Sequence, residues 1–366
     1  MLTLKSVTRI AANGMHNAFT SLCQWQAMTY VAYRQGQTHN TTPPGHIVIQ
    51  RSVDLETWEI AATLHTGCDD RDPHLVPTAE ALYCVWGMYA PMFDPWSRRL
   101  TTQGYDICTY GASTEDGTAW GPPYRLCRPG SWLWSMVEEP VQPQKPRLLT
   151  RTLGREADVA PPASLWYGVS YDVGDGAVDR CHTVTLWKGL SPVFWERWAT
   201  IIDACQRLSD LQPSEPALFW KAPETLACVI RTEENAYYGE AYEPYALWSW
   251  QDLGIAIHAP AVLYVPGMGW IVAGREYVPG KKKTDKPQVC GTSIWRLHCE
   301  EATAKVTRLV RLPSEGDCSY PGLVWDEARQ EVLISWYSQH EREVGRMRIP
   351  VAADVYLARL TVRGDK

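Results

Sequence analysis

The residues most able to do chemistry stand at the edges of short apolar runs. Asp317, Ser319 and Tyr320 immediately precede one such run at residues 321–325. Polar groups cost free energy when they are carried toward a core, so a cluster of this kind usually ends a loop or faces a cavity. A histidine in such a place can act as an acid or a base near neutral pH. The residue types therefore permit acid–base chemistry, provided that the fold brings them together.

A metal site is the first alternative for these polar residues. The groups that could in principle share an ion are His16, His39, His258, His340, Asp70 and Asp72. None of them stands at the helical spacing or in the compact motif that metal sites favour. We therefore expect no metal and no cofactor.

The elements that must position these residues read as β-strands. Short runs rich in Val, Ile, Tyr and Trp recur between clusters of Gly, Pro and Asp, a pattern that predicts an all-β fold. The runs group into six units of four strands (A to D), whose first strands are expected at 16–25, 71–77, 132–139, 214–220, 258–265 and 319–326. Units of about 40–60 residues with four strands each are typical of a β-propeller. Two packed β-sandwiches are the alternative.

The sixth unit runs out of chain before its fourth strand. Residues 2–10 belong to no other unit and can supply the missing strand, which would close the ring and remove an exposed sheet edge. We therefore predict a single six-bladed β-propeller domain over residues 1–366. A Pro-rich insertion at about 139–163 lies between strands A and B of the third unit. It is expected on the far rim, away from any catalytic part.

Antiparallel pairing selects the candidate site residues. The start of each strand A and the end of each strand B must lie on the same rim of the ring. The candidates on this rim are His16, Asn17, Arg34, Asp70, Arg71, Asp72, Tyr171, Glu215, Arg231, His258, Arg275, Tyr320, Tyr337 and His340. Long loops at 89–105, 276–288 and 338–354 emerge on the same side, as functional loops often do.

Two features resemble known propeller families. The turn at 113–120 resembles the Asp-box of sialidase-type propellers, with Glu115 at the aspartate position, and 52–58 resembles a version one residue shorter. The order Glu215, Arg231, Arg275, Tyr320 is similar to that of sialidases. The stretches HNAFTSL, YRQG, RDPHL and YGVSYD resemble uncharacterised bacterial sialidase-like (BNR-repeat) propellers still more closely. These motifs are specific for the group and not for an activity.

The resemblance to sialidases implies roles for individual residues. Tyr320 would be the nucleophile and Glu215 the base that deprotonates it. A neutral phenol can approach a substrate carboxylate that would repel a carboxylate nucleophile. Arg231 and Arg275 would hold the substrate carboxylate through paired hydrogen bonds, and Arg34 matches an arginine after the second strand of blade one.

The chain departs from the sialidase pattern at two places. His16 and Asn17 stand where that family has an arginine at the start of blade one, and His39 stands where it has an acidic aspartate. His39 is therefore a candidate general acid, with Asp72 and Asp70 as further possible acids. The resulting catalytic set is Tyr320, Glu215, His39 and Asp72, and the remaining rim residues are assigned to substrate binding.

These expectations define a function and its alternatives. The chain is expected to be a glycoside hydrolase that releases an acidic terminal sugar, sialic-acid-like or uronic. A lyase on uronate-containing polysaccharide with a His/Tyr pair and a non-catalytic glycan-binding propeller are the alternatives. A net charge of −6 argues against nucleic acid as a partner. No apolar run reaches membrane-spanning length, no signal-peptide pattern is seen, and the eleven cysteines stand mostly alone, so a cytoplasmic protein with no membrane partner is expected.

Overall fold

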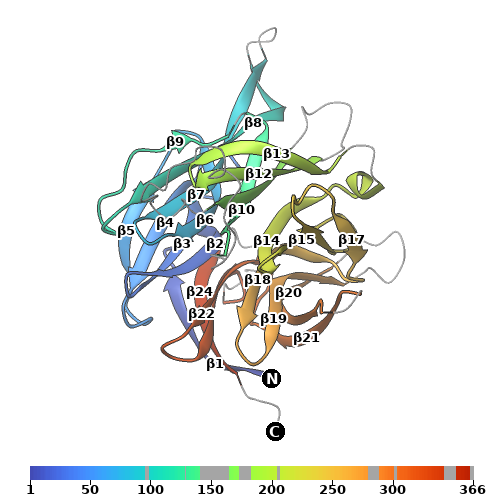
Figure 1. The fold of residues 1–366 in the computed structure, drawn as a ribbon. Coiled ribbons are helices and arrows are strands. Elements are labelled where there is room, and N and C mark those ends of the chain that lie inside the picture. Colours follow the sequence, from blue (N-terminus) through green and yellow to red (C-terminus); the bar gives the residue numbers. More distant parts are fainter. Residues whose placement is uncertain are drawn as a thin grey trace, which may run out of the picture.

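The computed structural model describes residues 1–94, 99–127, 129–140, 165–172, 183–203, 207–278, 288–300, 303–341 and 352–362. Within these ranges the strands form six four-stranded antiparallel sheets, arranged as blades around a central axis (Figure 1). The predicted β-propeller is confirmed, and the alternative of two packed sandwiches is not what the chain adopts. No helix in the described ranges is long and apolar enough to cross a bilayer.

The first three blades follow one another along the chain. Blade one contains β2 (His16–Trp25), β3 (Met28–Gly36), β4 (His46–Ser52) and β5 (Glu59–Leu64). Blade two contains β6 (Asp69–Pro77), β7 (Leu82–Asp94), β8 (Arg99–Thr114) and β9 (Tyr124–Arg125). Blade three contains β10 (Ser131–Glu138), β11 (Trp166–Asp172), β12 (Thr183–Ser191) and β13 (Phe194–Ile202).

A short 3₁₀ helix, η2 (Arg207–Leu211), leads into the second half of the ring. Blade four contains β14 (Ser214–Ala222), β15 (Thr225–Arg231), β16 (Tyr237–Tyr242) and β17 (Ser249–Asp252). Blade five contains β18 (Ile257–Val265), β19 (Gly269–Val278), β20 (Gln288–His298) and β21 (Lys305–Arg311). Blade six contains β22 (Ser319–Asp326), β23 (Glu331–Ser338), β24 (Asp354–Val362) and β1 (Leu2–Ala11).

The ring closes as predicted, through strands from both ends of the chain. β1 pairs antiparallel with β24, with Leu2 opposite Val362 and Arg9 opposite Tyr356. The first and last described strands, β1 and β24, therefore lie side by side in blade six. This pairing gives blade six its outer strand, so its inner strands are not left as an open edge.

Blade-to-blade packing explains the richness in tryptophan. Every residue of β23 is buried, as are six of the seven residues of β15, because each of these strands is covered on both faces by neighbouring blades. Trp86, Trp295 and Trp336 are among the largest fully buried side chains. Fully burying a large apolar side chain contributes roughly 1.5–3 kcal/mol. These tryptophans therefore stabilise the ring and are not placed to stack on a ligand.

Two turns between strands C and D share one hydrogen-bond pattern. The Oδ1 atom of Asp54 accepts from the backbone N–H groups of Glu56 and Thr57, and Oδ1 of Asp116 accepts from those of Thr118 and Ala119. The sequence alignment that put Glu115 at the aspartate position was therefore wrong. The Ser52 hydroxyl accepts the backbone N–H of Leu55, and the Thr114 hydroxyl accepts that of Gly117 in the same way. The second turn therefore begins at Thr114, and both turns are seven residues long, at 52–58 and 114–120.

Some predicted segments fall outside the described residues. The Pro-rich insertion at 139–163 is described only at residues 139 and 140, and parts of the three long rim loops, at 95–98, 279–287 and 342–351, are also outside the described ranges.

Candidate functional site

The inner strands share a backbone irregularity near their starts. In five blades one residue adopts a positive φ: Phe19 (59°), Asp72 (52°), Glu215 (53°), Ala259 (48°) and Tyr320 (50°). At each of these places the pairing with strand B shifts register, as in a β-bulge. Blade three has its register shift between Leu133 and Ser135, which gives Trp134 the equivalent position. A bulge re-aims a side chain, and backbone strain of about 1–3 kcal/mol per residue is typically kept at functional sites.

These six residues, which we call the bulge ring, meet at the axis. The ring of Phe19 lies 4.8 Å from that of Tyr320, and Trp134 lies 6.3 Å from Tyr320, measured between ring centroids. The hydroxyl of Tyr320 donates to Oε1 of Glu215 at 2.6 Å. The repeated bulge therefore places one side chain from each blade around a common centre.

Glu215 is the best-connected carboxylate of the bulge ring. Arg231 Nη1 donates to the same Oε1 at 2.7 Å, and the backbone N–H of Ala259 donates to Oε2 at 2.7 Å. Burial would raise the pKa of Glu215, but Arg231, the Tyr320 hydroxyl and the Ala259 N–H together hold it below its ordinary value. Glu215 is thus an ionised acceptor at neutral pH.

The phenol of Tyr320 is neutral at rest. Burial, followed by the charges of Glu215 and Asp72, raises its pKa well above the ordinary value. Because Glu215 is ionised and already accepts the phenolic hydrogen bond, it can receive that proton when the oxygen attacks an electrophile. Burial also raises the pKa of Asp72, to about 7, with the charge of Glu215 adding to the effect and Arg71 opposing it.

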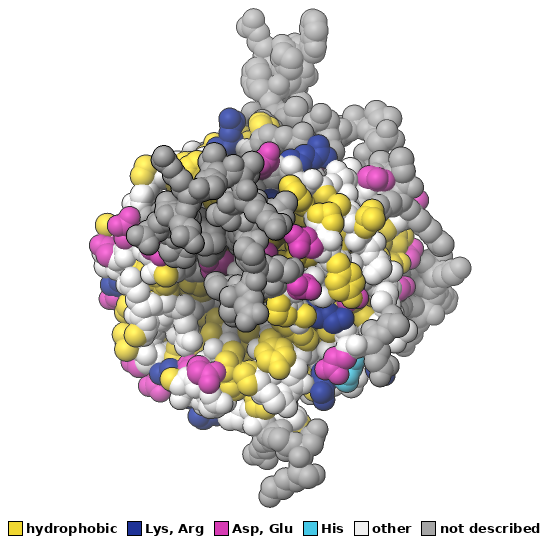
Figure 2. Space-filling model, viewed as in Figure 1, with side chains coloured by type: hydrophobic (Ala, Val, Ile, Leu, Met, Phe, Trp, Pro, Cys, Tyr) yellow, Lys and Arg dark blue, Asp and Glu magenta, His cyan; other side chains and the backbone are white. Residues whose placement is uncertain are grey.

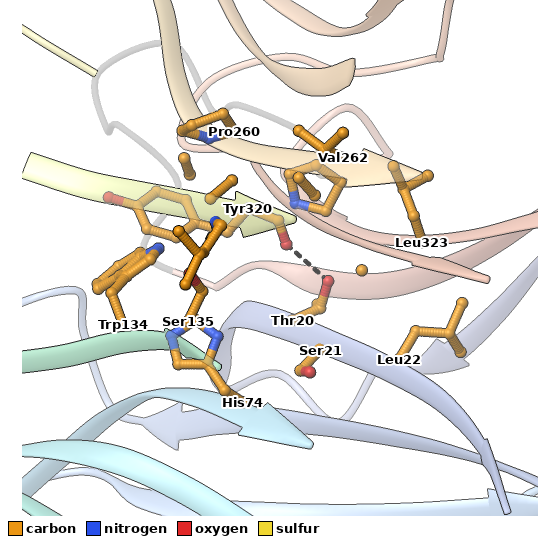
Figure 3. Close-up of a pocket in the computed structure, with 16 residues that line it drawn as sticks. Thr20, Ser21, Leu22, His74, Trp134, Ser135, Pro260, Val262, Tyr320 and Leu323 are labelled. Carbon is orange, nitrogen blue, oxygen red and sulfur yellow. Dashed lines mark hydrogen bonds between the residues drawn. The ribbon is translucent and has the colours of Figure 1, made fainter. Parts of the chain in front are cut away.

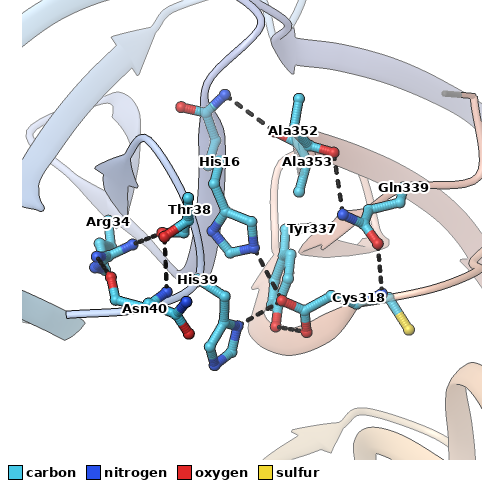
Figure 4. Close-up of polar contacts among 12 residues, drawn as sticks. His16, Arg34, Thr38, His39, Asn40, Cys318, Tyr337, Gln339, Ala352 and Ala353 are labelled. Carbon is cyan, nitrogen blue, oxygen red and sulfur yellow. Dashed lines mark hydrogen bonds and ion pairs between the residues drawn. The ribbon is translucent and has the colours of Figure 1, made fainter. Parts of the chain in front are cut away.

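A second carboxylate, Asp317, connects blades one, five and six. Its Oδ1 atom accepts from the Tyr337 hydroxyl at 2.7 Å and from Arg275 Nη2 at 3.1 Å. Its Oδ2 atom is 2.9 Å from His16 Nε2 and 2.6 Å from His39 Nδ1 (Figure 4). Burial opposes its ionisation, yet the two histidines and Arg275 hold the pKa of Asp317 far below its usual range.

His16, His39 and Asp317 also form the one group of metal-ligand type found among the described residues, with three ligand atoms within 4.8 Å of one another. An ionised carboxylate only accepts hydrogen bonds, so both facing ring nitrogens must carry protons to make these two short contacts. Arg275 and Tyr337 already satisfy the other oxygen. Hydrogen bonds of this kind account for both oxygens of Asp317.

Arg275 lies above Tyr320 as part of the same cluster. Its guanidinium carbon is 5.3 Å from the centroid of the Tyr320 ring, close enough for a cation–π interaction. Its Nε donates to the backbone oxygen of Cys318 at 2.7 Å, and Nη2 also donates to the Tyr337 hydroxyl at 2.8 Å. His258 is buried nearby, beside Tyr277, and burial followed by the charge of Arg231 lowers its pKa to about 3.

Several predicted substrate-binding residues lie away from the centre of the ring. Asp70 is fully buried and binds His65, Thr66 and Trp86, so it anchors the turn before β6. Asn17 is fully buried and donates to the Ala353 backbone oxygen. Turn and strand contacts occupy the polar groups of both residues, and their assignment to substrate contact stays a prediction.

Arg34, Tyr171 and His340 are likewise in contact with neighbouring residues of the protein. Arg34 is 0% exposed, and its guanidinium binds Asp69 and two backbone carbonyls (Figure 4). Tyr171 is buried and stacks on Trp132, with ring centroids 5.6 Å apart. His340 lies beside Tyr356, 4.7 Å away, and its Nδ1 contacts the Ser338 hydroxyl. Tyr171 also packs against Trp134 of the bulge ring, with centroids 5.7 Å apart, and burial, followed by the charges of Tyr89 and Glu215, raises its pKa well above the ordinary value.

The structure thus gathers Tyr320, Glu215 and Asp72 with Arg71, Arg231, Arg275, His16, His39, His258 and Tyr337. It adds Phe19, Trp134 and Asp69, which the candidate set lacked, and Asp317, which the sequence singled out at the start of a strand without assigning it a role. A search for polar residues could not find the two aromatic ones. Their signal is positional, since each stands a few residues into strand A, at the same place as Tyr320 in blade six.

A cavity of about 190 Å³ continues along the axis on the other side of the bulge ring (Figure 3). Tyr320 and Trp134 stand at one end, and Thr20, Ser135 and His74 contribute polar groups to its wall. Its lining comes from residues that follow the bulges along the strands. The volume suits a few water molecules.

The comparisons show what this chain is similar to. A protein of unknown function from Dyadobacter fermentans matches 99% of this chain and 99% of its own at 16% identity, with a TM-score of 0.70. An α-L-arabinanase from Penicillium chrysogenum, solved with arabinobiose, matches 97% and 98% at 13% identity and a TM-score of 0.61. Trypanosoma rangeli sialidase, solved with sialic acid, matches 97% of this chain at 12% identity and a TM-score of 0.57.

The chain spans 57% of the length of that sialidase. No protein-family profile and no curated protein matches the chain. At these identities the similarity establishes the propeller fold, which this chain shares with glycoside hydrolases and with a protein of unknown function.

Proposed function

We propose that this chain is a glycoside hydrolase that releases an acidic terminal sugar, sialic-acid-like or uronic, with Tyr320 as nucleophile and Glu215 as its base. The observation that carries the proposal is the 2.6 Å hydrogen bond from the Tyr320 hydroxyl to Glu215 at the centre of the ring, with Arg231 on the same carboxylate oxygen. An ionised base already in contact with a neutral phenol is the arrangement that nucleophilic catalysis needs.

The reaction proceeds in two steps. The Tyr320 oxygen attacks the anomeric carbon while its proton passes to Glu215, and the bond to the leaving oxygen breaks as that oxygen takes a proton from an acid of the site. Water then attacks the glycosyl–tyrosine bond, giving one proton to the conjugate base of that acid. The second hydrogen of the water stays in the new anomeric hydroxyl, and Glu215 returns the proton that it took from Tyr320 to the phenolate, which restores the resting site.

Arginine contacts support an anionic substrate. The Arg231 side chain is 21% exposed, so its guanidinium group is partly open to a ligand oxygen. Arg275 stands on the other side of Tyr320. A sugar carboxylate between these two guanidinium groups would receive charge-assisted hydrogen bonds, and a neutral phenol would not repel it.

One observation favours a second candidate, a lyase on uronate-containing polysaccharide. The side chain of His39 is 52% exposed and held by Asp317, which suits a base that removes a proton from a sugar ring. A glycan-binding propeller without catalysis is the third outcome to be distinguished.

A panel of aryl glycosides of neutral and acidic sugars, together with uronate polysaccharides, separates these functions. Release of phenol from an acidic glycoside is expected. An ultraviolet-absorbing unsaturated product would indicate the lyase instead. Binding of the same sugars without turnover, measured by calorimetry, would favour the hypothesis of a non-catalytic glycan-binding propeller.

A further inference from the structure

The loop that follows β3 is held by an unusual set of contacts. The backbone carbonyls of three consecutive residues, Thr38, His39 and Asn40, each accept a hydrogen bond from an arginine, and Figure 4 shows the two that Arg34 donates. Arg34 binds the first and third carbonyls, at 2.8 and 2.9 Å, and Arg71 binds the middle one at 2.9 Å. Such a loop is normally free to move on the surface, so these bonds fix the backbone that carries His39.

Both arginines are in turn anchored to one buried carboxylate, Asp69. Arg34 Nη2 donates to Asp69 Oδ1 at 2.6 Å, and Arg71 Nε lies 3.5 Å from Oδ2. The same Oδ1 accepts the backbone N–H of Gly45 at 2.6 Å, which fixes the far end of the loop. We call Arg34, Asp69 and Arg71 the loop cradle.

Glycines make room for the cradle. A Cβ atom on Gly36 or on Gly45 would lie 2.6 Å from a nitrogen of the Arg34 guanidinium, so any larger residue at either place would push against a buried, paired group. The guanidinium is therefore held between two glycines. The loop is thus held by buried charged side chains in addition to its own backbone contacts.

The ring of His39 is held as firmly as its backbone. Asp317 binds Nδ1 at 2.6 Å, which leaves Nε2 as the nitrogen that can act on a bound molecule. Phe19 of the bulge ring packs against His39 with centroids 5.4 Å apart, and Phe19 also packs against Tyr320. His39 therefore stands at the mouth of the same site whose floor holds Tyr320.

We propose that Nε2 of His39 is the group that protonates the leaving oxygen and later deprotonates the attacking water, with Asp317 and the loop cradle as its positioning residues. This proposal rests on the hydrolase function proposed above. In the first step the proton of imidazolium Nε2 moves to the leaving oxygen as the glycosidic bond breaks. In the second, the neutral imidazole takes the proton that water loses.

Asp72 is the other candidate for the general acid, but its position favours a different role. Its side chain is 6% exposed, at the floor of the site beside Arg71 and within the fields of Glu215 and Tyr320. A leaving group departs toward solvent, where His39 is 52% exposed. Asp72 is placed to bond a hydroxyl of the sugar held on the floor.

Leaving-group dependence distinguishes the two acids. The substrates are aryl glycosides of the acidic sugar that the wild-type protein cleaves. On the methoxyphenyl glycoside, whose leaving group needs a proton, the kcat of His39→Ala should be about 10²- to 10⁴-fold below that of wild type. It should stay within about tenfold of wild type on the dinitrophenyl glycoside, whose leaving group does not. Asp72→Asn should lower kcat by the same factor on both substrates. His298 lies on the far rim, and His298→Ala is the histidine control, which should leave kcat on both substrates unchanged.

The positioning residues have their own signature. Asp317→Asn, Arg71→Lys and Gly45→Ala should each show part of the same leaving-group dependence while keeping the thermal transition of a folded protein. If kcat fell by the same factor on both substrates, these residues would stabilise the fold without positioning His39. Leaving-group dependence in Asp72→Asn but not in His39→Ala would overturn the proposal and leave the hydrolase function standing.

A readout independent of turnover completes the test. Imidazole ¹⁵N spectra should show His39 with its proton on Nδ1 in the neutral state, and Asp317→Asn should abolish this preference. A proton on Nε2 instead would contradict the arrangement. If no glycoside is cleaved, the proposed function fails and proton transfer to a leaving group fails with it, whereas the Nδ1 result would still decide whether Asp317 holds the ring.

Discussion

Two groups of arginines on the same rim differ in what surrounds them. Arg34 and Arg71, from blades one and two, bind Asp69 and three backbone carbonyls of the loop that carries His39. Arg231 and Arg275, from blades four and five, surround Tyr320 instead: Arg231 shares Glu215 with the Tyr320 hydroxyl, and Arg275 lies against the Tyr320 ring. The first group therefore holds the His39 loop, and the second group surrounds the proposed nucleophile.

The difference shows that residue type and rim position do not define a role by themselves. Arg34 satisfied every sequence criterion for a substrate contact, yet its guanidinium is 0% exposed and enclosed by Gly36 and Gly45. Burial and the geometry of the partners decide whether an arginine stabilises the fold or recognises an anion.

The largest expected effect concerns the hydroxyl that both groups surround. Tyr320→Phe should lower kcat on an acidic aryl glycoside by about 10³-fold or more, because it removes the nucleophile, while the melting temperature changes little. Loss of the hydrogen bond to Glu215 leaves the Arg231 contact in place. Steady-state kinetics and circular dichroism provide the two readouts, and unchanged kcat would remove Tyr320 from the mechanism.

The second effect separates the two arginine groups by stability. Arg34→Met should cost about 3–5 kcal/mol of unfolding free energy, since it leaves Asp69 buried with one ionic partner fewer. Arg231→Met should cost less, because Glu215 keeps the hydrogen bonds from the Tyr320 hydroxyl and the Ala259 N–H and can take up a proton. Urea denaturation of both variants makes the comparison, and equal losses would erase the distinction between the two groups.

The third effect concerns ligand recognition. Arg231→Lys keeps a charge beside Glu215 but loses the planar pair of donors, so KM for the acidic glycoside should rise roughly tenfold with a smaller change in kcat. Arg51→Lys, a surface pair with Glu59, is the matched control and should leave KM unchanged. A fall in kcat at constant KM would instead place Arg231 in the chemical step.

The smallest effect is a pH dependence of stability. Burial raises the pKa of Asp72 to about 7, so the folded protein retains a proton that the unfolded chain releases near its ordinary value of about 4. The contribution of Asp72 to stability should therefore fall as pH rises from about 4 to about 7 and then level off, whereas His74 and His258, whose pKa values burial lowers to about 4 and about 3, contribute the opposite trend. Asp72→Asn should remove this fall and gain about 1–3 kcal/mol over wild type at pH 8, less what Arg71 loses. Parallel denaturation curves at every pH would contradict the raised pKa.

The blades and the rim could be predicted from the sequence because they follow from local patterns. Alternating apolar runs and turn residues repeat in each unit, and antiparallel pairing then places the start of β14 beside the end of β15, with Ser214 opposite Arg231. Tyr320 and Glu215 were found this way, although 105 residues separate them.

The contacts that assign roles could not be predicted in the same way. Asp317 meets His39 across 278 residues, and no pattern within a single blade indicates that pairing. The bulges that aim Phe19 and Trp134 at the axis depend on backbone conformation, which apolar periodicity does not reveal. The turn at 114–120 was misaligned because the Thr114 hydroxyl replaces that of a serine.

The central claim is that Tyr320 forms a covalent bond to the sugar. The protein should be incubated with a fluorinated analogue of the acidic sugar that it hydrolyses, chosen to slow release of the enzyme-bound intermediate, and then measured by intact mass and peptide mapping. The account predicts one added sugar on Tyr320 and none in Tyr320→Phe. A sugar attached to Glu215 or Asp72, or hydrolysis that continues with no adduct on Tyr320, would contradict it.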